Sequence, residues 1–452
     1  MQITLQDDSA AANLPAFPVT PVAATDATTT DETSSCSSLR AASLLGILVL
    51  GYIGVYLCRK NFSVAVPLIQ RAFGVNKAAT GAVASASTMA YMAGKIIFGP
   101  LIDRWGGRVC LLLSLSGVAL FGGLGGLATS VPMLTIFYTA NRFSGSPGWG
   151  SMIKQVPDWF PARRLPMAMA VLSMSYAFGG VLALLLAGQI AKWSGDSWRA
   201  VMGAPSLVLA AILVLCWLTL PKEKSARIQG EHQISGSSPY AKILDVARSP
   251  QFWVVCGLSF VLTVTRDFFN DWTVDFFKTS GGGQMTTQIA SFLSTPFDAL
   301  GAVGMLFLGA LRAPLGRNGL KFMLVAMLLA LGGLIYSLPA LVHQPLWMAS
   351  TAIGLIGFLS YGPYSLLAGV FAVEIRGKSH VATVAGFVDA SGYVAGAMAG
   401  YPFGLILDHG GYRMGFHVLA VTTLLAVLLC FFLYGKTYVD DEAKLKMQTV
   451  TS

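Results

Sequence analysis

Charged residues are scarce in this chain of 452 residues: only 11% are Asp, Glu, Lys or Arg, whereas 54% are hydrophobic. The mean hydropathy of +0.65 is far above that of a soluble domain, in which about a quarter of the residues are charged. The 21 Asp and Glu residues are fewer than the 30 Lys and Arg residues, which leaves a formal net charge of +9. This composition excludes a soluble globular protein and predicts an integral membrane protein.

Several motifs of other protein classes are also missing. The chain has no GxxxxGK[ST] phosphate loop that would indicate ATP as the energy source, and no HExxH or nucleophile-elbow motif. Its six cysteines form no CxxC spacing, and its Lys and Arg form no long basic block. We therefore expect no enzymatic activity, no cofactor, no metal and no nucleic-acid partner.

Apolar runs long enough to cross a membrane fill most of the chain. A helix needs about 20 apolar residues to cross a core about 30 Å thick. Such runs lie at residues 43–69, 79–102, 109–129, 132–156, 167–193, 199–220, 252–278, 286–311, 320–341, 346–373, 382–407 and 413–435. We predict an all-α polytopic membrane protein with 12 transmembrane helices in two six-helix bundles that are pseudo-repeats of each other.

A single long polar segment divides these runs into six and six. The predicted parts are a disordered cytoplasmic tail (1–40), an N-terminal bundle (41–220), a cytoplasmic linker (221–250), a C-terminal bundle (251–436) and a cytoplasmic tail (437–452). Lys and Arg are concentrated in the loops on the side of both termini, so the positive-inside rule places both termini in the cytoplasm. The acidic N-terminal tail argues against a transit peptide. We expect a plasma or bacterial inner membrane and leave an organelle open.

Two adjacent cations, Arg59 and Lys60, interrupt the first apolar run. On insertion scales a Lys or Arg costs roughly 2.5–3.5 kcal/mol at the centre of a membrane helix, so the pair requires partners, water or a function. Tyr52, Tyr56 and Arg59 are spaced i, i+4 and i+7, which places them on one helix face.

The second apolar run and the second half carry similar residues. Tyr91 and Lys95 again place a phenol and a cation one helical turn apart, and Arg266 lies in the seventh run at a depth similar to that of Arg59. Parallel repeats bring such a pair of arginines together at the midplane. Because guanidinium forks match phosphate or carboxylate oxygens, these residues predict a site for a small polyanion, with phosphate favoured.

Structural ion pairs are the alternative explanation for the buried cations. The carboxylates available for them within the apolar runs are Asp267, Asp271, Asp298, Glu374 and Asp389. Lys60 points about 100° away from Arg59 around the helix. We therefore expect Lys60 to form an ion pair, with Asp271 as its predicted partner.

The loop between the second and third runs, GPLIDRWGGR at 99–108, contains turn glycines and an Asp103–Arg104 pair. This short loop fits a cytoplasmic tie between two helices and resembles the loop signature of the major facilitator superfamily. The corresponding loop of the second half, GALRAPLGRNG at 309–319, has Arg312 where that signature has an acid.

Further motifs resemble a narrower family. They are RKNF at 59–62 after Tyr52 and Tyr56, YMAGK at 91–95, NRFSGSPGWG at 141–150, DWF at 158–160, RDFFNDW at 266–272, GFLSYGP at 357–363 and AGFVDASGYVAG at 385–396. Together they resemble the organophosphate:inorganic phosphate antiporter family, which includes glycerol-3-phosphate and hexose-phosphate transporters. The resemblance extends from residue 45 to residue 435.

This resemblance implies exchange of a phosphorylated metabolite for inorganic phosphate by alternating access, in a monomer within the lipid bilayer. It implies that Arg59 and Arg266 bind the phosphoryl group, and that Asp271 and Asp298 exchange ion-pair partners. The remaining substrate-binding residues that it implies are Lys95, Tyr52, Tyr56, Tyr91, Tyr361 and Tyr393. Tyr176 joins this site because it replaces a histidine of the glycerol-phosphate transporters. Thr263 replaces a tyrosine, so the organic half of the substrate stays open.

Two other functions stay open on the sequence. The same family includes sugar-phosphate sensors, for which phosphate-dependent capture of a partner without flux would be decisive. A proton-coupled symporter of another organic anion would use an acid such as Asp298 or Glu374, and its flux would follow a pH gradient rather than phosphate.

Overall fold

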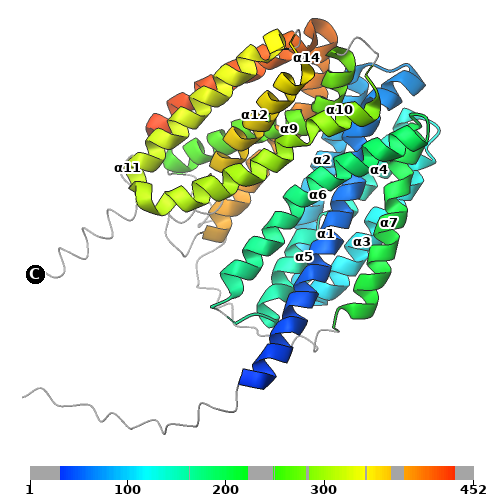
Figure 1. Ribbon diagram of the computed structural model, residues 1–452, viewed down its shortest axis with the longest axis vertical. Helices are drawn as coiled ribbons and strands as arrows, with labels where there is room; N and C mark the ends of the chain where they lie inside the picture. Colours follow the sequence, from blue (N-terminus) through cyan, green and yellow to red (C-terminus); the bar gives the residue numbers. More distant parts are fainter. Residues whose placement is uncertain are drawn as a thin grey trace, which may run out of the picture. The chain divides into compact units, whose positions relative to one another are not determined.

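The computed structural model describes residues 31–161, 163–221, 248, 250–280, 285–341, 344–367 and 381–432. Every regular element in these ranges is a helix, so the predicted all-α class is confirmed (Figure 1). The helices are α1 (Asp31–Phe73), α2 (Lys77–Trp105), α3 (Gly107–Gly126), α4 (Val131–Gly145), α5 (Gly148–Gln155), η1 (Val156–Asp158), α6 (Leu165–Trp193), α7 (Trp198–Thr219), α9 (Pro250–Ser280), α10 (Thr287–Ser294), α11 (Pro296–Leu341), α12 (Leu346–Leu366) and α14 (Val381–Phe432).

The predicted spans coincide with these helices, although the helix ends differ from the predicted ones. The run 132–156 is divided between α4 and α5 at Ser146 and Pro147, and the run 286–311 is divided between α10 and α11 at Thr295. The helix α11 then continues into the run 320–341, and α14 continues from the run 382–407 into the run 413–435. Gly411 has a φ of 62° inside α14, a left-handed conformation that glycine adopts without steric cost. In the described ranges, eight helical stretches are long and apolar enough to cross a membrane.

The N-terminal boundary differs from the predicted tail. The chain divides into residues 1–42 and residues 43–452, and α1 begins in the first of these units at Asp31. Residues 31–40 contain no Pro or Gly, the two residues that most disfavour a helix. The rest of the predicted tail (1–30), most of the linker (222–247) and the C-terminal tail (433–452) lie outside the described residues.

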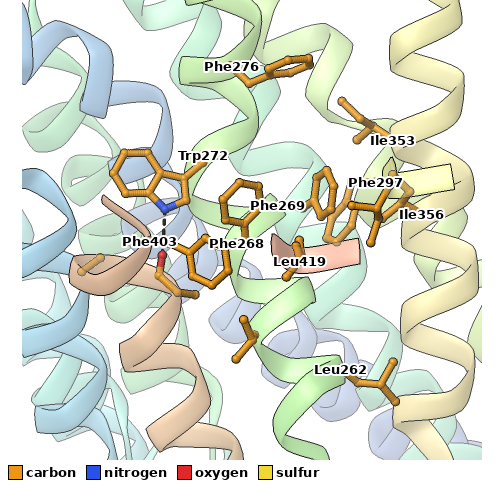
Figure 2. Close-up of a cluster of buried hydrophobic side chains, with 14 of the residues drawn as sticks. Leu262, Phe268, Phe269, Trp272, Phe276, Phe297, Ile353, Ile356, Phe403 and Leu419 are labelled. Carbon is orange, nitrogen blue, oxygen red and sulfur yellow. Dashed lines mark hydrogen bonds between the residues drawn. The ribbon is translucent and has the colours of Figure 1, made fainter. Parts of the chain in front are cut away.

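Within residues 43–452, we call α1–α7 the N-terminal half and α9–α14 the C-terminal half. In the N-terminal half α3 and α7 run alongside each other (Figure 1). In the C-terminal half an aromatic core surrounds α9 (Figure 2). Phe268 and Phe269 contact the rings of Phe403, Phe297 and Phe416. This packing buries one face of α9 and sets the direction of its opposite face.

The two halves meet closely where α2 crosses α14. Four glycines of α14, at 392, 396, 400 and 404, follow each other at four-residue spacing. A Cβ at Gly400 would lie 2.5 Å from the carbonyl oxygen of Gly81, and the Ser85 hydroxyl accepts a 2.8 Å hydrogen bond from the Tyr401 amide. Small residues allow this backbone approach between membrane helices.

Polar contacts join the same end of the two halves. Asp408 of α14 accepts hydrogen bonds from the first two amides of α2, at 2.9 and 2.8 Å. Lys77 at the start of α2 forms an ion pair with Asp275 of α9, and Asp196 lies 3.8 Å from Lys278. We call this the joined end of the molecule.

The glycine contact at the joined end leads to a stability prediction. Gly400→Val should lower the free energy of unfolding by about 1–3 kcal/mol, because the added methyls meet the Gly81 backbone rather than a flexible side chain. Thermal unfolding in detergent can be followed with a thiol-reactive dye that reports exposure of the buried cysteines. Gly333→Val of α11 is the matched control, because nothing lies within 4 Å of a Cβ there. Equal melting temperatures for both variants would contradict the prediction.

Candidate functional site

A cavity of about 270 Å³ lies between the two halves. Its lining includes all nine residues predicted to bind substrate, so the structure brings these residues together. The lining residues are Tyr52, Tyr56, Arg59, Lys60, Thr88, Tyr91, Lys95, Arg142, Trp149, Tyr176, Thr263, Arg266, Asp267, Asn270, Asp298, Tyr361, Tyr364, Asp389, Gly392 and Tyr393.

The N-terminal half places Arg59 among tyrosines. The Arg59 guanidinium carbon lies 5.3 Å from the ring centroid of Tyr56 and 5.6 Å from that of Tyr91. Its Nη1 is 3.5 Å from the Tyr56 hydroxyl, and the Arg59 backbone carbonyl accepts a 3.0 Å hydrogen bond from Tyr138. Aromatic faces attract a cation without neutralising it, so Arg59 keeps its charge for a ligand.

The C-terminal half presents Arg266 from α9. Thr263, Arg266, Asp267 and Asn270 are spaced i, i+3, i+4 and i+7, so one helix face lines the cavity while the opposite face enters the aromatic core. The Arg266 guanidinium carbon lies 4.1 Å from the ring centroid of Tyr364, and its Nε is 3.5 Å from Asp267 Oδ1. Arg59 and Arg266 thus line one cavity from opposite halves.

Lys60 forms an ion pair, but its predicted partner was wrong. Its Nζ lies 2.6 Å from Asp298 Oδ2 of α11, and it also donates a hydrogen bond to Asn270. The other oxygen of Asp298 accepts a 2.9 Å hydrogen bond from Tyr361. Asp298 reaches Lys60 because Gly180 of α6 has no side chain: a Cβ there would lie 2.7 Å from Asp298 Oδ2.

Asp271, the partner predicted for Lys60, lines a smaller neighbouring cavity of about 40 Å³. That cavity is also lined by Lys60, Arg59 and Arg142. Asp271 therefore remains near the buried cations, but in the described residues it forms no ion pair within 4.0 Å.

Two further predicted residues have identified partners. Lys95 of α2 lies 3.8 Å from Asp389 of α14 and 5.2 Å from the ring centroid of Tyr393. Residues 99–105 of the predicted loop belong to α2, and Asp103 in its last turn contacts Lys154 of α5 at 3.4 Å. The ion pair found for Asp103 is thus with Lys154 rather than with its neighbour Arg104, because Lys154 reaches back to the end of α2, where it also donates to the carbonyls of Ile102 and Asp103.

Sequence reasoning missed several residues that line the cavity. They are Arg142, Trp149, Asn270 and Tyr364. Asp389 was named from the sequence only as a carboxylate for a structural ion pair, and it lies 3.8 Å from Lys95. Arg142 could have been found, because it is a cation within the apolar run 132–156. The free-energy cost of placing a cation in a membrane helix, which drew attention to Arg59, applies equally to Arg142. The polar and aromatic residues carry no such signal, since their helix faces become known only from packing.

The cavity has an excess of positive charge. Five cations line it (Arg59, Lys60, Lys95, Arg142 and Arg266), against the three carboxylates of Asp267, Asp298 and Asp389. Among the described residues, neither Arg59 nor Arg142 has a carboxylate within 4.0 Å. The described residues also contain no cluster suited to a metal ion. Such a cavity suits a small polyanion, which guanidinium groups can bind through two oxygens at once.

Comparisons with known proteins agree with this fold. A solved bacterial homologue of the human lysosomal transporter Spinster, inward-facing and occupied, aligns with a TM-score of 0.72 at 16% identity, covering 88% of this chain and 98% of that one. The probable hexose phosphate transport protein of Chlamydia pneumoniae is 25% identical over 88% of this chain and 92% of its own length. The Bacillus subtilis (strain 168) glycerol-3-phosphate transporter is 26% identical, covering 86% and 91%.

A sensor is similar to a comparable degree. The membrane sensor protein UhpC of Escherichia coli (strain K12) is 25% identical over 86% of this chain and 91% of its own length. None of these named relatives is an enzyme, in agreement with the sequence-based expectation. The model of the Major Facilitator Superfamily matches residues 48–400. The chain therefore belongs to the Major Facilitator Superfamily, and its curated relatives fall within the organophosphate:inorganic phosphate antiporter family of that superfamily.

Proposed function

We propose that this protein is a secondary active transporter that exchanges a phosphorylated metabolite for inorganic phosphate by alternating access. The observation that carries the proposal is the cavity that Arg59 and Arg266 line from opposite halves, with no carboxylate of the described residues within 4.0 Å of Arg59. The similarity to hexose-phosphate and glycerol-3-phosphate transporters supports the same substrate class.

In the proposed mechanism the phosphoryl group binds between the two guanidiniums. Each guanidinium offers parallel N–H donors to a pair of phosphate oxygens. A bound dianion neutralises two like charges that otherwise repel each other across the cavity, and it therefore lowers the barrier to reorientation of the halves. In an empty site the two positive charges are not neutralised, so the barrier to reorientation stays high. The proposed mechanism therefore favours exchange over net uniport.

The contacts at the joined end indicate from which side of the membrane the cavity is reached. With both termini in the cytoplasm, the joined end faces outward, and Asp408, Lys77 and Gly400 close the outer side of the cavity. The cavity would then be reached from the cytoplasm. We propose a monomer in a plasma or bacterial inner membrane as the transporting unit.

Reconstitution tests the proposed function directly. Proteoliposomes containing the purified protein are loaded with labelled phosphate, and its efflux is measured after external addition of hexose, triose or glycerol phosphates. We expect efflux that requires an external organophosphate or phosphate and that is absent from protein-free vesicles. Efflux driven by a pH gradient and insensitive to external phosphate would favour proton-coupled symport instead.

A sensor is the second candidate, because UhpC is as similar as the transporters are. The discriminating measurement is binding without flux. Organophosphate that stabilises the purified protein against heat, in vesicles that show no phosphate exchange, would favour the sensor over the transporter.

A further inference from the structure

Arg142 of α4 lines the cavity and has no counterion among the residues that the structure describes. Arg142 is only 7% exposed. It lines the main cavity and also two smaller cavities. The ring of Tyr91, whose centroid is 4.8 Å from the guanidinium carbon, is its neighbour. In the described part of the chain, no carboxylate oxygen lies within 4.0 Å of its nitrogens.

A buried guanidinium in this state is costly. It presents five N–H donors and a charge, and it loses their hydration on burial. The face of Tyr91 attracts the charge but accepts no pair of hydrogen bonds. The donors of Arg142 are therefore available to an anion or to water in the cavity.

The position of Arg142 next to Arg59 limits which anion it meets. Both guanidiniums lie against the Tyr91 ring, at 4.8 and 5.6 Å from its centroid, and both line the same smaller cavities. Arg266 lines the main cavity from the other half. A ligand whose phosphoryl group lies between Arg59 and Arg266 thus meets a third guanidinium on the Arg59 side.

We propose that Arg142 binds a second anionic group of the substrate, so that the preferred substrates are organic phosphates that also carry a carboxylate or a second phosphate. This inference rests on the proposed function, because it takes the Arg59–Arg266 cavity to be the phosphate site. Tyr91 holds the Arg142 guanidinium in place from one face, and the nitrogens at its edge bind the second group.

Asp271 offers the competing explanation. It lines the cavity of about 40 Å³ together with Arg142, which is large enough for a water that could bridge the two charges. In that case Arg142 would serve to neutralise Asp271 and would have no influence on which substrate is preferred.

Paired substrates test the proposal in reconstituted vesicles that contain the full-length protein. The probes are glycerol 3-phosphate against 3-phosphoglycerate, and glucose 6-phosphate against 6-phosphogluconate, each as competitors of phosphate–phosphate exchange. In each pair the second compound adds a carboxylate. We expect the wild type to prefer it by about 10- to 100-fold, the range for charged hydrogen bonds.

Three variants separate the explanations. Arg142→Gln should reduce the preference in both pairs to within about 3-fold of unity, whereas Arg142→Lys should retain a part of it because the charge remains. The matched control is Arg199→Gln, which removes a guanidinium that stacks on Trp198 outside the cavity. It should leave the preference at the wild-type value.

Two results would overturn the proposal, and a third would overturn the proposed function on which it rests. A wild type that exchanges phosphate but shows no preference within the pairs would do so while leaving the proposed function intact. So would an Arg142→Gln variant that weakens both members of each pair equally and regains them when Asp271→Asn is added. A wild type with no phosphate exchange at all would instead remove the proposed function on which the inference rests.

Discussion

Replacing Arg59 with lysine should lower the rate of phosphate exchange about 100-fold and leave the protein folded. The guanidinium of Arg59 is held by Tyr56 and Tyr91 and has no carboxylate partner among the described residues, so its donors are free for phosphate oxygens. Lysine keeps the charge but loses the fork that binds two oxygens. Charged hydrogen bonds are worth about 1.5–3 kcal/mol each, and every 1.4 kcal/mol changes an affinity about tenfold.

The measurement is counterflow of labelled phosphate in proteoliposomes, together with a melting curve in detergent. Arg199→Lys serves as the control, because Arg199 stacks on Trp198 and donates to the Ala128 carbonyl away from the cavity. Normal exchange by Arg59→Lys would show that the Arg59 guanidinium does not bind the phosphoryl group. A large loss of thermal stability in that variant would show that Arg59 serves the fold instead.

Breaking the Lys60–Asp298 ion pair on one side should destabilise the protein by about 3–5 kcal/mol. Lys60 is 8% and Asp298 3% exposed. Lys60→Met therefore leaves the carboxylate buried, with the Tyr361 hydroxyl as its remaining side-chain donor among the described residues. The double variant Lys60→Met/Asp298→Leu should recover most of the lost stability, because two apolar residues replace a buried ion pair at little cost. The exposure of buried cysteines to a thiol-reactive dye during heating measures each melting temperature.

Lys154→Met is the control for the Lys60 and Asp298 variants. Its partner Asp103 has a side chain that is 84% exposed, and exposed ion pairs are typically worth at most about 1 kcal/mol. We expect the double variant to be folded but deficient in exchange, because Lys60 and Asp298 join the two halves at the cavity. Equal losses of stability in Lys60→Met and Lys154→Met would show that the Lys60–Asp298 pair contributes little.

The positions of the cavity-lining residues along each helix were predictable, because the spacing of Tyr52, Tyr56 and Arg59 places them on one face whatever the neighbouring helices do. The pseudo-repeat also predicted that Arg266 would face Arg59 at a similar depth, and both residues line one cavity. The partner of Lys60 was not predictable. Asp271 and Asp298 both lie in the second half, and the choice depends on helix rotation and on the space left by Gly180.

The sequence by itself determined that this is a helical membrane protein, where its spans lie, and which cations interrupt them. These features follow from local hydropathy and from helix periodicity, which the surrounding lipid imposes on any chain of this composition. Only the tertiary structure decided that Lys60 pairs with Asp298, 238 positions away, that Arg142 lines the cavity, and that α2 and α14 approach closely at Gly81 and Gly400. The reason is that these contacts depend on how distant helices rotate and approach each other, which side-chain packing between the two halves sets.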